Sequence, residues 1–195
     1  MTKGRSFFAG RVGEEVAVGE LEIVDDPTDA RAFGASRHDA EGLACRRNVL
    51  IEGGILRGFV FDTVSARRAS TVSTASAVRG GYATTPVAGC RAVLLTPGAL
   101  DVQGIMSEVD EGLYVQSVTG IHSGVNPVSG DFSVGAEGLM VRGGELAEPV
   151  REVTIASTLQ RMLRSVLHIG CDVEWLPGAA AGQTVAIGDI ALSGV

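Results

Sequence analysis

The stretch that most restricts how this chain can fold is the glycine-rich segment between residues 120 and 138, which reads GIHSGVNPVSGDFSVGAEG. Glycine reaches positive φ without steric cost and lets another backbone approach closely. Ser, Asn and Asp bond to neighbouring main chain and stabilise turns. Strand-like runs flank the segment, at Leu113–Val118 and Leu139–Val141. The sequence therefore predicts a shaped surface loop, and long loops of this kind are more often functional than connecting.

The polar side chains of this segment are the candidates for contact with a peptide or a partner protein. Each carries a hydrogen-bonding group on a loop that a ligand can reach. The histidine is the most interesting of them, although a lone loop histidine serves more often in hydrogen bonding than as a metal ligand. The candidates are His122, Ser123, Asn126, Asp131 and Ser133.

Two Gly-Gly pairs predict β-hairpins. Gly53-Gly54 separates two strand-like runs within residues 48–61, and Gly143-Gly144 does the same within residues 139–147. A two-residue connection of this kind suits a type I′ turn, in which both central residues need positive φ. Further strands are expected at residues 16–24, 91–96, 153–156 and 184–192.

One segment has the spacing of an amphipathic helix, at about residues 158–169. Its apolar residues recur at intervals of three and four, and Gly170 can end it. One or two short helices are also expected, at residues 63–70 and after Asp101.

The balance of these elements predicts the α+β class, mainly antiparallel β, with a curled or barrel-like sheet and helices at an edge or end. The 27 glycines are about twice ordinary usage, while only 6 prolines occur, which suits tight turns rather than linkers. A length of 195 residues fits a single domain spanning residues 1–195.

Charge and cysteine content limit the function and the compartment. A formal net charge of −7 argues against direct binding of nucleic acid. No run approaches the roughly 20 apolar residues of a membrane helix, so no membrane contact is expected. Three cysteines are an odd number and fit a reducing compartment. A cytoplasmic location is therefore predicted.

Spacing alone reveals no catalytic group of residues. Four acids fit a carboxylate pair or a hard-cation site, yet turn residues are the simpler interpretation. The histidines and cysteines are of the types that zinc prefers, but they lack Cys-x-x-Cys or His-x-x-x-His spacing. Cys45 precedes two arginines, whose charge can lower its thiol pKa, and burial is the alternative. The acids are Asp25, Asp26, Asp39 and Glu41, and the other residues are His38, His122, His168, Cys45, Cys90 and Cys171.

The residues from Gly124 onward form a longer pattern. It reads G-V-N-x-V-S-G-D-F-S-x-G-A-x-G, then an apolar strand, a Gly-Gly turn and E-P-V-x-E-V-T-I-A. This pattern resembles the C-terminal region of the TldD/PmbA proteins, and the GDFS and GA pieces resemble the PmbA (TldE) branch more than the TldD branch. The likeness continues through SF at 6–7, IVDDP at 23–27, VLIEGGIL at 49–56 and IGCD at 169–172.

The resemblance implies cytoplasmic proteins linked to peptide processing, whose active members are zinc peptidases. In those members a His-Glu-x-x-x-His motif lies just upstream of the part that is similar to Ser6–Glu14, and a cysteine near the C-terminus completes the metal site. The printed chain contains no such motif and reads AAAGQ at residues 179–183, around the position of that cysteine. The role does not pass to Cys171. The resemblance thus implies no catalytic residue and no cofactor here, with zinc only on a TldD-like partner.

Three functional interpretations stay open. The first is the non-catalytic C-terminal domain of a PmbA/TldE-like subunit, which pairs with a TldD-like subunit or with itself and holds an extended peptide by strand addition. The second is an active hydrolase that uses His122, Asp131 or a cysteine. The third is a stand-alone binding or oligomerisation module. An older description of the family as a modulator of DNA gyrase adds no prediction of direct DNA contact, given the acidic charge balance.

Overall fold

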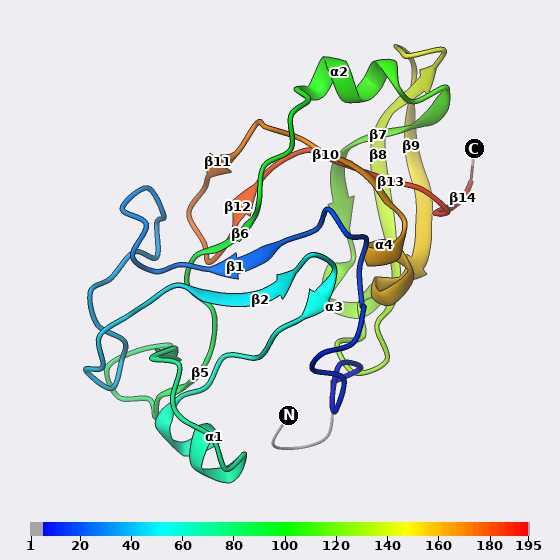
Figure 1. Ribbon diagram of the computed structural model, residues 1–195. Coiled ribbons are helices and arrows are strands. Elements are labelled where there is room, and N and C mark those ends of the chain that lie inside the picture. The colour runs from blue at the N-terminus through cyan, green and yellow to red at the C-terminus, as the bar shows by residue number, and fades with distance from the viewer. Residues whose placement is uncertain (1–5, 195) are drawn as a thin grey trace. The chain divides into compact units, whose positions relative to one another are not determined.

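The computed structural model describes residues 6–194, and they form two compact units (Figure 1). The first unit holds residues 6–96 and 173–183, and the second holds residues 97–172 and 184–194. Because a compact unit is not necessarily one that folds alone, the single domain at 1–195 stays a prediction.

A small antiparallel sheet forms the centre of the first unit. Its strands are β1 (Ile23–Asp25), β2 (Asn48–Glu52), β3 (Ile55–Leu56) and β6 (Val93–Leu95), in the order β3-β2-β1-β6. Two ribbons accompany it, β4 (Ala77–Val78) with β5 (Val87–Ala88) and β11 (Glu174–Trp175) with β12 (Ala181–Gly182). The helix α1 (Thr63–Arg68) is capped by Asp62, whose side chain accepts a hydrogen bond from the Ser65 N–H. Val16, Leu21 and Ile51 are among the buried core residues.

The second unit is built on longer strands. Its sheet contains β7 (Glu111–Thr119), β8 (Asp131–Arg142), β9 (Glu145–Thr158) and β14 (Ala191–Ser193), all antiparallel, in the order β14-β9-β8-β7. A separate ribbon pairs β10 (Val166–Ile169) with β13 (Val185–Ile187). Three short helices complete it, α2 (Val102–Ser107), α3 (Ile121–Gly124) and α4 (Leu159–Arg164). Val134, Met140 and Val153 are buried in this unit.

Both predicted Gly-Gly hairpins are confirmed. Gly53 and Gly54 join β2 to β3 with φ of 59° and 73°, and Gly143 and Gly144 join β8 to β9 with φ of 58° and 81°. Positive φ at both centres is what a type I′ turn requires, so local turn chemistry sets these two connections.

The predicted fold class is confirmed in its coarse form, as mostly antiparallel sheet with few short helices. The described strands form no closed barrel, because β7 and β14 stand at opposite ends of their sheet without pairing with each other. A barrel would need those two edges to join.

The amphipathic helix predicted at 158–169 is wrong in its second half. Thr158 caps α4 by accepting a hydrogen bond from the Arg161 N–H, but the helix ends at Arg164. Residues Val166–Ile169 instead form β10 against β13. Gly170 therefore does not end a helix, and the pairing with a distant strand overrides the helical spacing.

Two other strand predictions also change. The strand predicted at 16–24 contributes only β1, at its end, and the one predicted at 184–192 divides into β13 and β14. Asp189 lies between these two strands with a φ of 55°, outside the extended region. Within residues 6–194, no helix is long and apolar enough to span a membrane.

Candidate functional site

The glycine-rich loop is shorter than predicted. Gly120, with a φ of 78°, begins the single turn of α3, and a tight turn follows at Asn126. From Asp131 onward the chain is strand β8, which pairs with β9 on one side and with β7 on the other. The loop therefore spans residues 120–130, and the prediction of a loop up to residue 138 is wrong.

Two glycines of the predicted loop, Gly135 and Gly138, lie in strand β8. They allow neighbouring strands to pack closely and are not needed for a flexible loop. A Cβ on Gly138 would lie 2.0 Å from the Tyr114 carbonyl oxygen, and one on Gly135 would lie 2.5 Å from the Thr119 hydroxyl oxygen. Glycine in a strand often marks a bulge or a close backbone approach. The register between β8 and its neighbours shifts beside Gly138. The close approach of the backbones there explains why glycine occurs within this strand.

Two of the five candidate side chains are engaged in the loop's own turn. The Asn126 Oδ1 accepts hydrogen bonds from the backbone N–H of Val128 at 2.9 Å and of Ser129 at 3.3 Å. The Asp131 carboxylate accepts one from the Ser129 hydroxyl at 2.6 Å. Gln160, from α4, donates to the Ser129 carbonyl at 2.7 Å. These contacts shape the turn, as such side chains commonly do.

The other three candidates are exposed. His122 and Ser123 lie on α3, and the Ser123 hydroxyl donates to the Gly120 carbonyl at 3.2 Å. Ser133 lies on β8, and α3 packs closely against its backbone. A Cβ on Gly124, the last residue of α3, would lie 1.9 Å from the Ser133 carbonyl oxygen. Contact of these five residues with a peptide or partner stays a prediction.

A more prominent feature is the strand that leads into this loop. β7 runs for nine residues, pairs with β8 along one edge, and has no strand on its outer edge among residues 6–194. Residues Val115–Thr119 are exposed on both faces, with Val115 and Val118 each 39% exposed. An edge of this kind presents a row of unpaired N–H and C=O groups, which is a template for another strand.

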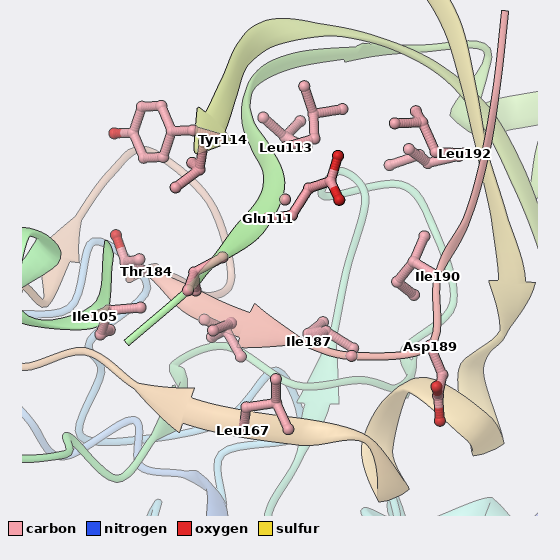
Figure 2. Close-up of a pocket in the computed structure, with 18 of the residues that line it drawn as sticks. Ile105, Glu111, Leu113, Tyr114, Leu167, Thr184, Ile187, Asp189, Ile190 and Leu192 are labelled. Carbon is pink, nitrogen blue, oxygen red and sulfur yellow. The ribbon is translucent and has the colours of Figure 1, made fainter. Parts of the chain in front are cut away.

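The second unit also contains a cavity of about 500 Å³. It is bounded by the β14-β9-β8-β7 sheet, the β10–β13 ribbon and the end of α2 (Figure 2). Most of its lining is aliphatic, and it includes five consecutive residues of β7, Glu111 to Val115. Other lining residues include Ile105, Met140, Ile155, Met162, Leu167 and Ile187.

Three charged groups meet at the cavity's β7 side. Arg142 donates to Glu148 at 2.6 Å and to Glu111 at 3.0 Å. The hydrogen bonds from Arg142 hold the pKa of Glu148 below its usual value. Glu111 lines the cavity and Glu148 does not. Figure 2 shows the Glu111 carboxylate pointing into the space between Leu113, Ile190 and Leu192. One cation thus faces two carboxylates, and the group carries a net charge of −1.

The acids of the first unit are structural. Asp25 is fully buried, and its Oδ1 accepts hydrogen bonds from the backbone N–H of Arg91 at 2.9 Å and of Ala92 at 2.8 Å. Asp39 accepts from the N–H of Ala77, 38 residues away, at 3.1 Å. Asp26 accepts from the Thr28 N–H at 3.0 Å and so shapes the turn after β1. A structural role for these carboxylates is thereby supported, because Asp26 shapes a turn while Asp25 and Asp39 join segments distant in the chain.

Glu41 reaches the start of α1. Its carboxylate accepts a hydrogen bond from the Thr63 N–H at 2.9 Å. An acidic group at a helix N-terminus satisfies a free donor of the first turn, so Glu41 has the same structural role as the other acids.

The metal-ligand types do not gather. Among residues 6–194, no group of three or more His, Cys, Asp or Glu side chains could hold a metal ion. A zinc site needs three or four such ligands around one point, so the described residues do not fit this metal. Burial raises the pKa of the Cys45 thiol more than Arg91 lowers it. The net change is a raised thiol pKa for Cys45, which supports the burial alternative rather than a lowered pKa.

The outer edge of β7 and the cavity beside it were not anticipated from the sequence. The strand-like run at Leu113–Val118 predicted a strand but carried no signal about which of its edges would be free. The cavity is lined from segments far apart in the chain, from Ile105 to Leu192. Neither feature depends on a local motif.

Comparison with known proteins gives a consistent result. The family described as "PmbA/TldA metallopeptidase C-terminal domain" matches residues 1–194. A metalloprotease PmbA homolog of Haemophilus influenzae is 31% identical over 170 residues, covering 87% of this chain and 35% of the relative. The crystal structure of TldE from Thermococcus kodakarensis superposes with a TM-score of 0.91 at 27% identity, covering 98% of this chain and 44% of that one.

A Thermotoga maritima protein described as a modulator of a DNA gyrase superposes with a TM-score of 0.87 at 28% identity, covering 98% of this chain and 43% of that one. The chain spans about two fifths of the length of the curated relatives it matches. With almost every residue matched and the same fold in solved relatives, the chain belongs to the PmbA/TldD metallopeptidase family, in which it corresponds to the C-terminal domain.

Proposed function

We propose that this chain holds extended peptides as the C-terminal part of a PmbA/TldE-like subunit, without metal ligands of its own. The catalytic zinc then belongs to a TldD-like partner in a two-component peptidase. The observation that carries the proposal is the nine-residue outer edge of β7, which has no strand beside it in the part of the chain described. Extended peptides bind such edges through main-chain hydrogen bonds.

The exposure of β7 supports this role. An ordinary antiparallel strand buries one face, whereas Val115–Thr119 are exposed on both faces. Main-chain hydrogen bonds to such an edge supply affinity without depending on a particular peptide side chain. The exposed His122 and Ser123 follow directly after the end of β7, where they remain candidates for contact with the same peptide.

Family membership supplies the substrate class. The relatives are named metalloproteases, so peptide is the natural ligand to test. The lack of a three-ligand cluster among residues 6–194 favours holding over cleavage. The free cysteines Cys45, Cys90 and Cys171 support a cytoplasmic location.

Strand addition leaves a signature in amide hydrogen exchange. A nine-residue peptide bound along β7 should slow exchange at every second amide of Glu111–Thr119, because alternate N–H groups point to the outer edge. We expect a peptide of the same sequence, N-methylated at consecutive residues, to lose both binding and protection. Binding of the methylated peptide with equal affinity would contradict the proposal.

A second candidate function uses the same edge for self-association. Two copies of β7 can pair edge to edge, and the exposed Val115 and Val118 would then meet in the joint sheet. This module would act without enzymatic partners. Light scattering at tens of micromolar protein should show a dimer in that case. An excess of the nine-residue peptide should dissociate this dimer, because both compete for the same edge. A monomer at all such concentrations would rule this candidate out.

A further inference from the structure

The cavity of the second unit is too large to be a packing defect. Protein interiors leave few voids larger than a water molecule, whereas this cavity measures about 500 Å³. That volume lies within the range of small-molecule sites, roughly 300–1,000 Å³, which are lined mainly by apolar side chains. Leu167, on β10, lines it and is 60% exposed. The apolar surface is therefore available to an occupant.

The cavity reaches the strand that the proposed function uses. Successive side chains of a strand point to opposite faces, so a cavity on one face alone would be lined by every second residue. Five consecutive residues of β7 line this one, which places it against the β7 backbone as well. A peptide strand added to the outer edge would thus have side chains within reach of the aliphatic lining.

Charge selects among apolar occupants. The group formed by Glu111, Arg142 and Glu148 carries a net charge of −1, and Glu111 lies on the cavity wall. A ligand with a negative charge close to Glu111 is therefore disfavoured, and a ligand with a positive charge beside its apolar part is favoured. Two methionines in the lining, Met140 and Met162, allow side chains of different shape to fit.

We propose that the cavity is a specificity pocket that receives one large apolar side chain of the bound peptide, with a preference for Lys or Arg two residues away. This inference rests on the proposed function, since the peptide is the one held by β7. Residues i and i+2 of a strand share a face, so the basic side chain would lie on the same face as the apolar one, close to Glu111. The pocket would thus select among peptide side chains, which main-chain hydrogen bonds to β7 do not distinguish.

The test compares four nine-residue peptides by fluorescence anisotropy. They carry Leu or Ala at the centre, with Lys or Glu at the second position on either side. We expect Leu to bind at least about tenfold more tightly than Ala, because one methylene in an apolar pocket already changes selectivity by roughly tenfold or more. Lys should be preferred over Glu at the flanking positions.

Two pairs of variants assign these preferences to the cavity. Ala186→Leu narrows it from β13 and should remove the Leu preference while leaving the Ala peptide bound, and Ile190→Trp repeats the test from another segment. Glu111→Gln should reduce the preference for Lys. Glu148→Gln is the matched control, because it removes a carboxylate from the same Arg142 at a position that does not line the cavity. Its effect on the Lys preference should be smaller.

The outcomes separate the two proposals. Equal binding of Leu and Ala peptides, with alternate β7 amides protected, would overturn the pocket and leave strand addition standing. A Leu preference that Ala186→Leu and Ile190→Trp abolish, without β7 protection, would keep an apolar side-chain site and overturn strand addition. Binding of none of the four peptides would overturn both.

Discussion

At the residue scale, the three thiols of the chain differ in how far water reaches them. Cys171 is exposed, whereas Cys45 and Cys90 are half-buried. Burial, together with a smaller contribution from the nearby Asp25, raises the pKa of Cys90 to about 11. Burial also raises the pKa of Cys45. Since the thiolate is the nucleophile, exposure and pKa together set the order of reactivity.

We expect one fast-reacting thiol at pH 7 in the folded chain, namely Cys171. With a pKa of about 11, Cys90 is ionised to only about one part in ten thousand at that pH. Alkylation followed by mass spectrometry should label Cys171 first, and Cys171→Ser should abolish the fast phase. In denaturant all three should react alike. Fast labelling of Cys90 in the folded state would contradict this burial argument.

At the element scale, the pairing of β7 with β8 depends on glycines that let the two backbones approach. Gly138 has no positive φ, so its requirement is space rather than conformation. A Cβ there would stand 2.0 Å from the Tyr114 carbonyl oxygen, and backbone cannot swing aside as a side chain can. The close approach of the β7 and β8 backbones at Gly138 therefore helps to position both the outer edge of β7 and the cavity wall that β7 forms.

Gly138→Ala should therefore lower the free energy of unfolding by about 1–3 kcal/mol, the usual range for overpacking. Urea unfolding measures it. Gly182→Ala is the matched control, because Gly182 also lies in a strand with no positive φ, and a Cβ there would have only an ordinary contact of 3.9 Å with the Glu174 carbonyl oxygen. We expect the control to be neutral or slightly stabilising. Equal loss in both variants would point to a general strand effect instead.

At the scale of the whole molecule, the chain leaves the second unit after Asp172 and re-enters it at Thr184. The Asp172 carboxylate ties these two points together. It accepts hydrogen bonds from the Thr184 hydroxyl at 2.7 Å and from the Thr184 N–H at 3.1 Å. These bonds, the one from the hydroxyl foremost, hold the pKa of Asp172 below its ordinary value of 3.8.

A lowered folded pKa fixes the direction of the pH effect. The contribution of Asp172 is fully present above the pKa of the unfolded chain, near 3.8, and is lost as pH falls through the still lower folded value. We expect the stability difference between wild type and Asp172→Asn to be constant from pH 7 to 5 and to shrink below about pH 4. Urea unfolding across this range measures it. A difference that grows on acidification would contradict the assignment.

The proposed division of labour also predicts the metal content of the chain. The purified protein, loaded with zinc and then dialysed, should retain well under one zinc per chain, because residues 6–194 bring no three ligands together. Elemental mass spectrometry measures this, and a known zinc peptidase treated in parallel is the control. One tightly held zinc per chain together with peptide cleavage would overturn the proposal that catalysis lies on a partner subunit.

Several local features could be predicted because their causes lie within a few residues. The Gly-Gly turns and the cap at Asp101, which accepts a hydrogen bond from the Gly104 N–H at 2.7 Å, each depend on neighbours in the chain. The end of α4 could not be predicted in this way, because the apolar residues between 159 and 167 keep the spacing of a helix past Arg164. Of the five candidate side chains, His122, Ser123 and Asn126 lie within residues 120–130, whereas Asp131 and Ser133 lie on β8. The cavity and the outer edge of β7 were missed.

The amino-acid sequence by itself determined the family, the antiparallel character and the positions of the hairpins. These follow from residue types whose preferences act over short distances, and from a pattern that extends along the whole chain. Only the tertiary structure decided that Val166–Ile169 form a strand, that residues 131–138 are sheet rather than loop, and that β7 keeps one edge unpaired. Each of these depends on backbone groups distant in the chain, whose hydrogen bonds outweigh local preference once they are buried together.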